Sequence, residues 1–185
     1  MKITVRDIPE EGLNLSFDTT KDGWFREIVL DALRDSMGPK DVDTGEVHLF
    51  RTNLNVEISG QLECKAHLEC SRCASTFLKI LPIPIHFTLS PLYENEEEME
   101  RRELDEVELV KEDLEFAFYD GERFNLGELL REQMILSLPI QPLCNEDCKG
   151  LCPQCGENLN LETCQCETSR RDPFWNTLKG FKIKN

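Results

Sequence analysis

The chain has 185 residues, a net charge of −15 and nine cysteines, and 39% of its residues are hydrophobic. This length suits one domain with an appended module, and the apolar content is sufficient for a core. Direct nucleic-acid binders usually carry a basic surface, so the charge argues against RNA binding by the chain as a whole. With no run of ~20 apolar residues and no secretory leader pattern, we expect a cytoplasmic protein without membrane contact.

The first 40 residues predict two short strands and one helix. Residues 3–8 and 13–17 are the two strand-like runs, and they are separated by a turn that ends at Gly12. Apolar residues at helical spacing then predict a helix from about residue 23 to residue 37, with Asp22 as its N-cap. The helix is expected to end at Gly38-Pro39.

The clearest pattern is the alternation of apolar or small residues with polar residues from 54 to 70. A period of two predicts a sheet with one solvated face. Because the run is longer than a typical strand, we expect Gly60 to mark a bulge or a sharp bend between two strands. The alternation resumes after Cys73, and Pro82 and Pro84 in that segment favour an edge strand.

An acidic segment, residues 94–122, follows with 14 acidic and 3 basic residues, and its end alternates again before a turn at Asp120-Gly121. Asn125 and Glu128 then predict a capping box that opens a helix over residues 126–138. We therefore expect an α+β domain over residues 1–140, with a curved, mostly antiparallel sheet and two main helices. We expect residues 141–185 to form a small, cysteine-rich, zinc-ribbon-like module and a basic tail.

Six of the nine cysteines lie between residues 144 and 166. Cys152-Pro-Gln-Cys155-Gly156 has the form of a zinc knuckle, a tight turn that points two sulfurs at one ion. Two further ligands are required, either from Cys144 and Cys148 or from Cys164 and Cys166. The downstream pair is preferred because a knuckle, a short loop and a returning pair resemble a zinc ribbon.

Other readings of these cysteines remain open. Six thiolates could hold two zinc ions through bridging sulfurs, hold an iron–sulfur cluster, or act as redox thiols. Cys70 and Cys73 lie at a turn of the predicted sheet and form a possible second thiol pair. They could be half of a metal site, a redox pair, or small residues buried at a corner of the sheet. An all-cysteine site has no open position for a substrate, so the sequence predicts neither catalytic residues nor a small-molecule substrate.

The last 19 residues have 5 basic and 2 acidic residues, interleaved with Phe174, Trp175 and Phe181. Such a tail could stack on and neutralise RNA, or the aromatic residues could pack back onto the domain. The possible nucleic-acid contacts are Arg170, Arg171, Lys179, Lys182 and Lys184. A direct RNA- or DNA-binding zinc protein acting through this tail is the alternative function.

The region from Leu138-Pro139 to Cys166, together with Cys70-Ser-Arg-Cys73 and Phe124-Asn-Leu126 before a Glu-rich helix, resembles the bacterial YceD family. The resemblance implies a non-enzymatic ribosome-biogenesis factor that supports accumulation or processing of 23S ribosomal RNA and large-subunit assembly. Its expected partners are a ribosomal precursor particle, a ribosomal protein or ribosomal RNA. The acidic charge favours a basic protein surface as the direct contact.

Overall fold

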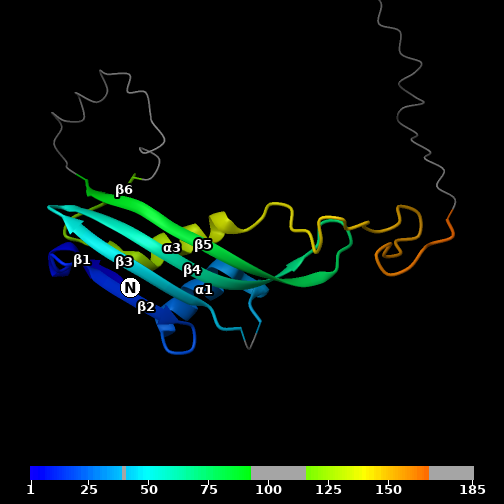
Figure 1. The fold of residues 1–185 in the computed structure, drawn as a ribbon, viewed down its shortest axis with the longest axis horizontal. Helices are drawn as coiled ribbons and strands as arrows, with labels where there is room; N and C mark the ends of the chain where they lie inside the picture. The colour runs from blue at the N-terminus through cyan, green and yellow to red at the C-terminus, as the bar shows by residue number, and fades with distance from the viewer. Residues whose placement is uncertain (39–40, 93–115, 167–185) are drawn as a thin grey trace, which may run out of the picture.

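The computed structural model describes residues 1–38, 41–92 and 116–166. The main sheet has the strand order β2-β3-β4-β5-β6, and a separate two-stranded sheet pairs β1 with β7. Figure 1 shows both helices on one side of the main sheet and a cysteine-rich region at the far end of its longest hairpin. The expected α+β fold, with a mostly antiparallel sheet and two main helices, is confirmed.

The strands of the main sheet differ greatly in length. They are β2 (Leu13–Asp18), β3 (Thr44–Thr52), β4 (Asn55–Glu69), β5 (Thr76–Pro91) and β6 (Phe116–Tyr119). Neighbouring strands are antiparallel except β5 and β6, which are parallel. The small sheet consists of β1 (Lys2–Thr4) and β7 (Arg123–Asn125).

Helices α1 (Gly23–Leu33) and α3 (Leu126–Ser137) cover the apolar face of the sheet. Single 3₁₀ turns follow β1 and α1, at Val5–Asp7 and Arg34–Ser36. The alternation in β4 places every second side chain against the helices, and the helices contribute residues at helical spacing. The fully buried side chains of this core include Phe25, Val29, Val56, Ile58, Leu62, Leu130 and Met134.

Several local predictions need correction. The helix predicted to reach residue 37 ends at Leu33, and the strand predicted over residues 3–8 is limited to Lys2–Thr4. Two further differences concern Gly60 and Asn125. Gly60 does not separate two strands: β4 runs through it, with φ +155°, and a Cβ there would lie 2.1 Å from the carbonyl oxygen of Glu46. The glycine therefore allows β3 and β4 to approach closely. Asn125 precedes α3 as predicted, but its side chain makes no capping hydrogen bond. Its Oδ1 atom accepts a hydrogen bond from the N-terminal amine of Met1 at 3.3 Å.

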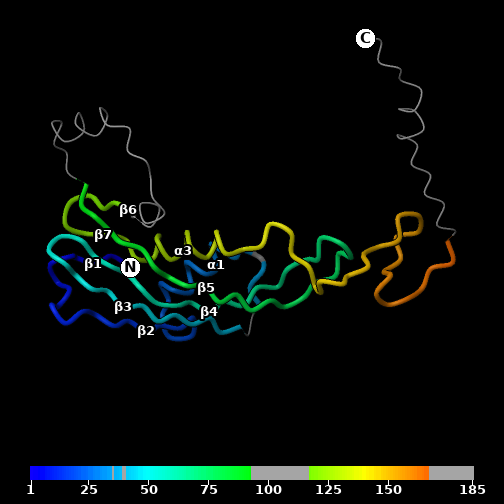
Figure 2. The backbone as a smooth tube through the Cα atoms, turned by 45° about the horizontal axis from the view of Figure 1, so that its top comes forward, coloured from blue at the N-terminus to red at the C-terminus, as the bar shows by residue number. Residues whose placement is uncertain are grey.

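The β4–β5 hairpin links the core to the cysteine-rich region. Its pairing extends from Val56–Leu89 to Glu69–Thr76, whereas β6 pairs only with the end of β5, from Thr88 to Pro91. Among the described residues the remainder of β5 is an edge, as its prolines predict. Figure 2 shows the tip of the hairpin reaching beyond the helices toward the cysteine-rich region. None of the helices in the described ranges is long and apolar enough to cross a membrane.

Candidate metal centres

Eight cysteines form two groups, and within each group the sulfurs lie within 4.8 Å of one another. The proximal site is the group next to the sheet, Cys70, Cys73, Cys144 and Cys148. The distal site is the group Cys152, Cys155, Cys164 and Cys166. Each has the residue types and number of a closed structural zinc site.

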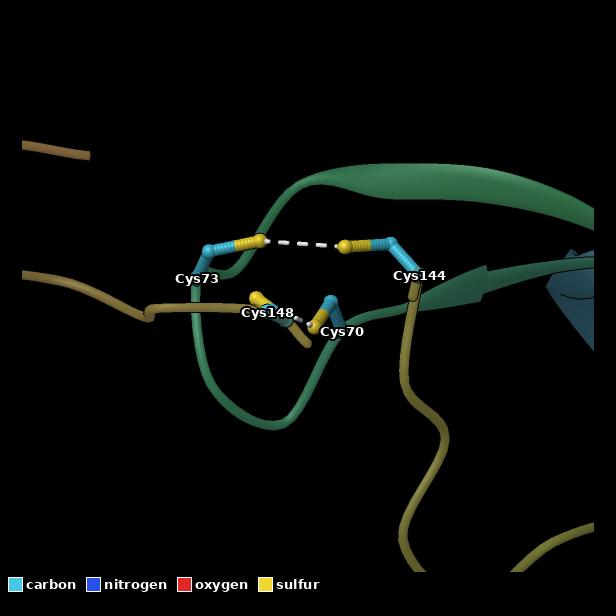
Figure 3. A group of neighbouring side chains, drawn as sticks. All are labelled: Cys70, Cys73, Cys144 and Cys148. Carbon is cyan, nitrogen blue, oxygen red and sulfur yellow. Dashed lines mark hydrogen bonds between the residues drawn. The ribbon is translucent and has the colours of Figure 1, made fainter. Parts of the chain in front are cut away.

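The proximal site joins parts of the chain that are far apart in sequence. Figure 3 shows Cys70 and Cys73 on the tip of the β4–β5 hairpin, with their sulfurs facing those of Cys144 and Cys148. The sulfurs of Cys70 and Cys148 are 3.8 Å apart, and those of Cys73 and Cys144 are 3.7 Å apart. Four sulfurs at ~2.3 Å from a tetrahedral zinc ion lie about 3.8 Å from one another. A disulfide would require ~2.05 Å. The spacing therefore fits a shared ion and excludes a disulfide in this arrangement.

The two CxxC turns, one in each site, have the same backbone geometry. In the proximal turn the N–H of Ala74 donates to the carbonyl oxygen of Cys70 at 2.9 Å, and in the distal turn Gly156 donates to Cys152 at 2.9 Å. The residue after each CxxC has a positive φ, 55° at Ala74 and 76° at Gly156. Both turns are therefore knuckles.

A second hydrogen bond repeats in both knuckles. The N–H of Cys70 donates to the carbonyl oxygen of Ser75 at 3.0 Å, and the N–H of Cys152 donates to that of Glu157 at 2.8 Å. The sequence hides this equivalence because the proximal knuckle has alanine where the distal knuckle has glycine. Positive φ is uncommon for alanine, so the sequence predicts a turn at Cys70 and Cys73 but not a second knuckle.

The knuckle geometry stabilises thiolates. The pKa of Cys70 is lowered to about 6, chiefly because the backbone N–H of Cys144 faces its sulfur, followed by N–H groups of the knuckle. The pKa of Cys152 is also lowered to about 6, through the N–H groups of Cys155 and Gln154. The Ser75 hydroxyl is the main cause of a lowered pKa at Cys73.

The pKa values of Cys144 and Cys166, which lie outside the knuckles, shift in the opposite direction. Burial, followed by the neighbouring thiols, raises the pKa of Cys144 to about 12. The pKa of Cys166 is raised to about 12, chiefly by its interaction with Cys155. Once one sulfur in such a group is ionised, repulsion keeps the next one protonated. A divalent cation removes that repulsion, so both groups have the electrostatics of a cation site.

The proximal site is the more buried of the two. Cys70, Cys73 and Cys148 are 2–5% exposed and pack with Phe77 and Leu143. In the distal site only Cys152 is buried, whereas Cys155 is exposed and the other two are partly exposed. The distal site is therefore the one more open to solvent.

Arg72, at the centre of the proximal knuckle, attaches the following segment to the hairpin. Its guanidinium donates to the carbonyl oxygens of Glu146 and Cys148, both at 3.0 Å. Its own carbonyl oxygen accepts the N–H of Leu151 at 3.1 Å, and the N–H of Ser71 donates to Pro142 at 2.8 Å. The knuckle thus holds residues 142–151 by main-chain contacts as well as by sulfurs.

The sequence-predicted site residues can now be placed. The structure brings the Cys152–Cys155 knuckle together with the preferred downstream pair, Cys164 and Cys166. It brings the upstream pair, Cys144 and Cys148, to Cys70 and Cys73, which lie 71 or more residues earlier in the sequence. The five basic residues predicted to contact nucleic acid lie beyond residue 166, outside the described residues.

Cys64 is the one cysteine outside both groups, and its environment differs. It is fully buried in the sheet core, and burial raises its pKa to about 12. A neutral thiol in an apolar setting behaves as a small hydrophobic side chain. Cys64 is therefore a core residue of the sheet domain.

Comparisons with known proteins agree on one family. A family model described as "Large ribosomal RNA subunit accumulation protein YceD" matches residues 58–182, more than half of the chain. A chloroplastic YCED homolog 1 of Arabidopsis thaliana, named as a large ribosomal RNA subunit accumulation protein, is 29% identical over 58 residues, 31% of this chain and 18% of the relative. The corresponding Zea mays protein is 36% identical over 55 residues, 29% of this chain and 18% of the relative.

A longer match is to an uncharacterised protein of Mycobacterium tuberculosis. It is 29% identical over 123 residues, which cover 66% of this chain and 54% of the relative. The chain thus spans about half, or less, of the length of these relatives. No solved structure matches the chain significantly.

Proposed function

Because the chain belongs to the YceD family, we propose that it is a non-enzymatic factor supporting accumulation or processing of 23S ribosomal RNA and assembly of the large ribosomal subunit in the cytoplasm. The description of the family and the names of the plant relatives support the link to large-subunit ribosomal RNA. The two closed four-cysteine groups support a structural role for the cysteine-rich region, since neither leaves a position for a substrate.

We propose zinc as the ion in both sites. The main supporting observation is that two sulfur–sulfur distances of the proximal site, 3.8 Å for Cys70–Cys148 and 3.7 Å for Cys73–Cys144, match the edge of a zinc–sulfur tetrahedron. All eight donors are cysteine sulfurs, which favour zinc over hard cations such as Mg²⁺ or Ca²⁺. When bound, zinc neutralises thiolate charge and cross-links the hairpin tip to residues 144–148.

The uncovered face of the main sheet suits a basic protein partner. Its β3 and β4 side chains include four exposed glutamates and one lysine, which are Glu46, Glu57, Glu63, Glu69 and Lys65. On the neighbouring β5, Leu78 and Ile80 are 50% and 53% exposed on the same face. Acidic and apolar groups together complement a basic polypeptide, whereas they repel a phosphate backbone.

The ribosomal role is tested by depleting the protein from its host cells. The proposal predicts a fall in 23S ribosomal RNA and in mature large subunits on sucrose gradients, both restored by the wild-type chain. Tagged protein should co-sediment with large-subunit precursors. Normal ribosomal RNA levels after depletion, together with no co-sedimentation, would contradict the role.

Charge reversal tests whether the uncovered face of the main sheet binds the basic partner. Glu57→Lys/Glu63→Lys changes two exposed side chains of the uncovered sheet face and should abolish co-sedimentation without changing metal content. Glu27→Lys/Glu132→Lys makes the same charge change on exposed positions of the two helices and is the matched control. Equal effects of the two double variants would show that the sheet face has no special role.

A further inference from the structure

The loop of the distal site, residues 157–162, lies against the proximal site. It connects Cys155 to Cys164, so it is closed by the distal cysteines. Leu151 and Asn158 form an antiparallel bridge, and the N–H of Leu159 donates to the carbonyl oxygen of Gly150 at 3.0 Å. The distal loop therefore pairs with the short segment that joins the two sites.

Two asparagine side chains of this loop contact the proximal site, Asn160 at a sulfur and Asn158 at the hydroxyl of Ser75. The Nδ2 group of Asn160 donates to the Sγ atom of Cys148 at 3.3 Å, and its Oδ1 atom accepts the N–H of Lys149 at 2.8 Å. The Nδ2 group of Asn158 donates to the hydroxyl oxygen of Ser75 at 3.1 Å. That hydroxyl in turn hydrogen-bonds the thiolate of Cys73.

The asparagines are also bound to each other. The Oδ1 atom of Asn158 accepts the Nδ2 group of Asn160 at 2.8 Å and its backbone N–H at 3.0 Å. The two amides therefore form one unit that depends on the fold of the loop. N–H groups aimed at metal-bound thiolates offset their negative charge, and removing such a contact typically weakens metal binding ~10–100-fold.

We propose that the two zinc sites bind cooperatively, with Asn160 and Asn158 carrying the coupling from the distal loop to Cys148 and Cys73. An ion in the distal site closes the loop and holds the Asn160 amide on the Cys148 sulfur and the Asn158 amide on the Ser75 hydroxyl. By thermodynamic reciprocity, an ion in the proximal site orders Cys148 and the Gly150–Leu151 segment on which the distal loop pairs. This inference rests on the proposed zinc sites.

The test is a zinc titration of the full chain against a competing chelator of known affinity. Three proteins define the coupling: the wild type, Cys164→Ser/Cys166→Ser with only the proximal site, and Cys70→Ser/Cys73→Ser with only the distal site. Coupling makes the wild-type constant for binding two ions exceed the product of the two single-site constants by about 10-fold or more. If the wild-type constant equals the product of the two single-site constants, so that this coupling ratio is one, the proposal is wrong.

Asn160→Asp isolates the contact that carries the coupling. The aspartate keeps an oxygen for the Lys149 N–H but places a second oxygen, in place of a donor, against Cys148. We expect two ions still to bind, with the excess affinity lost. In the proximal-only background the same substitution should have little effect, because the loop is no longer closed. Leu161→Ala, at a position of the same loop that is 81% exposed, is the matched control and should behave as the wild type.

The outcomes separate this inference from the proposed function. Two ions with an unchanged coupling ratio in Asn160→Asp would overturn the role of the asparagine and leave the zinc sites intact. Fewer than two ions in the wild type would overturn both the coupling and the zinc assignment. The ribosomal role is measured independently by depletion and sedimentation.

Discussion

The two ends of the molecule are stabilised by different physics. Residues 1–92 and 116–138 bury a continuous apolar core between a sheet and two helices. In residues 140–166 only Cys148, Gly150 and Cys152 are buried. Burial supplies ~25 cal/mol for each Å² of apolar surface, so the cysteine-rich region has little of this stabilisation available. Its fold therefore depends on its sulfurs, as in other small metal-bound modules.

The proximal site is where the two kinds of stabilisation meet. Its knuckle is the tip of a core hairpin, while Cys144 and Cys148 belong to the cysteine-rich region. The distal site has no ligand from the sheet. The comparison predicts that the cysteine-rich region can be unfolded without the sheet, and that core damage leaves the metal sites in place.

The largest effect is expected on metal removal. A strong chelator at neutral pH should unfold residues 141–166, because a structural zinc ion contributes on the order of 10 kcal/mol in small modules. Hydrogen exchange monitored by mass spectrometry should show protection lost there and retained in β3, β4 and β5. Unchanged protection in the cysteine-rich region would show that it folds without metal.

A core truncation should have the converse effect. Leu130 is fully buried on α3, and Leu130→Ala should lower the free energy of unfolding of the sheet domain by about 2–5 kcal/mol. Metal content per chain should not change. Leu136→Ala, at a residue of the same helix that is 76% exposed, should cost close to nothing and serves as the control. Loss of metal in Leu130→Ala would mean that the two regions are not separable.

A smaller, pH-dependent effect is expected at Asp43. This residue is fully buried: its Oδ1 atom accepts the N–H of Lys65, whereas Oδ2 has no partner among the described residues. Burial, with a contribution from Asp41, raises the pKa of its carboxyl above the usual value of 3.8. A carboxyl with a raised folded-state pKa favours folding at low pH, and this contribution is lost as pH rises through that pKa.

Asp43→Asn keeps the shape and the oxygen for Lys65 but cannot ionise. Relative to the variant, the wild type should therefore lose stability as pH rises from about 4 toward neutrality. Urea unfolding of the sheet domain across that range measures the difference. If the free energies of unfolding of the two proteins changed in parallel with pH, ionisation of Asp43 would not destabilise the folded state.

The smallest expected effect compares the two knuckles directly. Ala74→Gly should stabilise the proximal knuckle by about 1 kcal/mol, because a positive φ is unfavourable for alanine. Gly156→Ala should destabilise the distal knuckle by a similar amount, although a Cβ there would meet nothing within 4 Å. The chelator concentration that releases half of the metal should shift in opposite directions. If both substitutions shifted this chelator concentration in the same direction, the two knuckles would not be equivalent.

The sequence predicts those features whose signal is local. Alternation over β4 and β5 indicates their faces, and helical spacing locates α1 and α3 to within a few residues. The distal group is also local, since its four cysteines lie within 15 residues. The sequence does not predict strand β3, although Val47 and Leu49 alternate with polar residues, because the apolar Phe50 at a solvent-facing position interrupts the alternation.

The proximal site depends on contacts that no local pattern contains. Cys73 and Cys144 are 71 positions apart, and they meet only because the β4–β5 hairpin extends beyond the helices while α3 returns the chain along it. Asn158 and Asn160 are similarly ordinary loop residues in the sequence. Their contacts with Ser75 and Cys148 emerge only from the folded loop.

The most direct test is the metal content per chain of freshly purified wild type, Cys70→Ser and Cys152→Ser, measured by elemental analysis. Two separate four-cysteine zinc sites predict about two zinc ions in the wild type and a clear loss in each variant. Residual metal in Cys70→Ser should sit in the distal site, and that in Cys152→Ser in the proximal site. One ion in the wild type that persists in Cys70→Ser would contradict the proximal site, and with it the metal link between the hairpin and the cysteine-rich region.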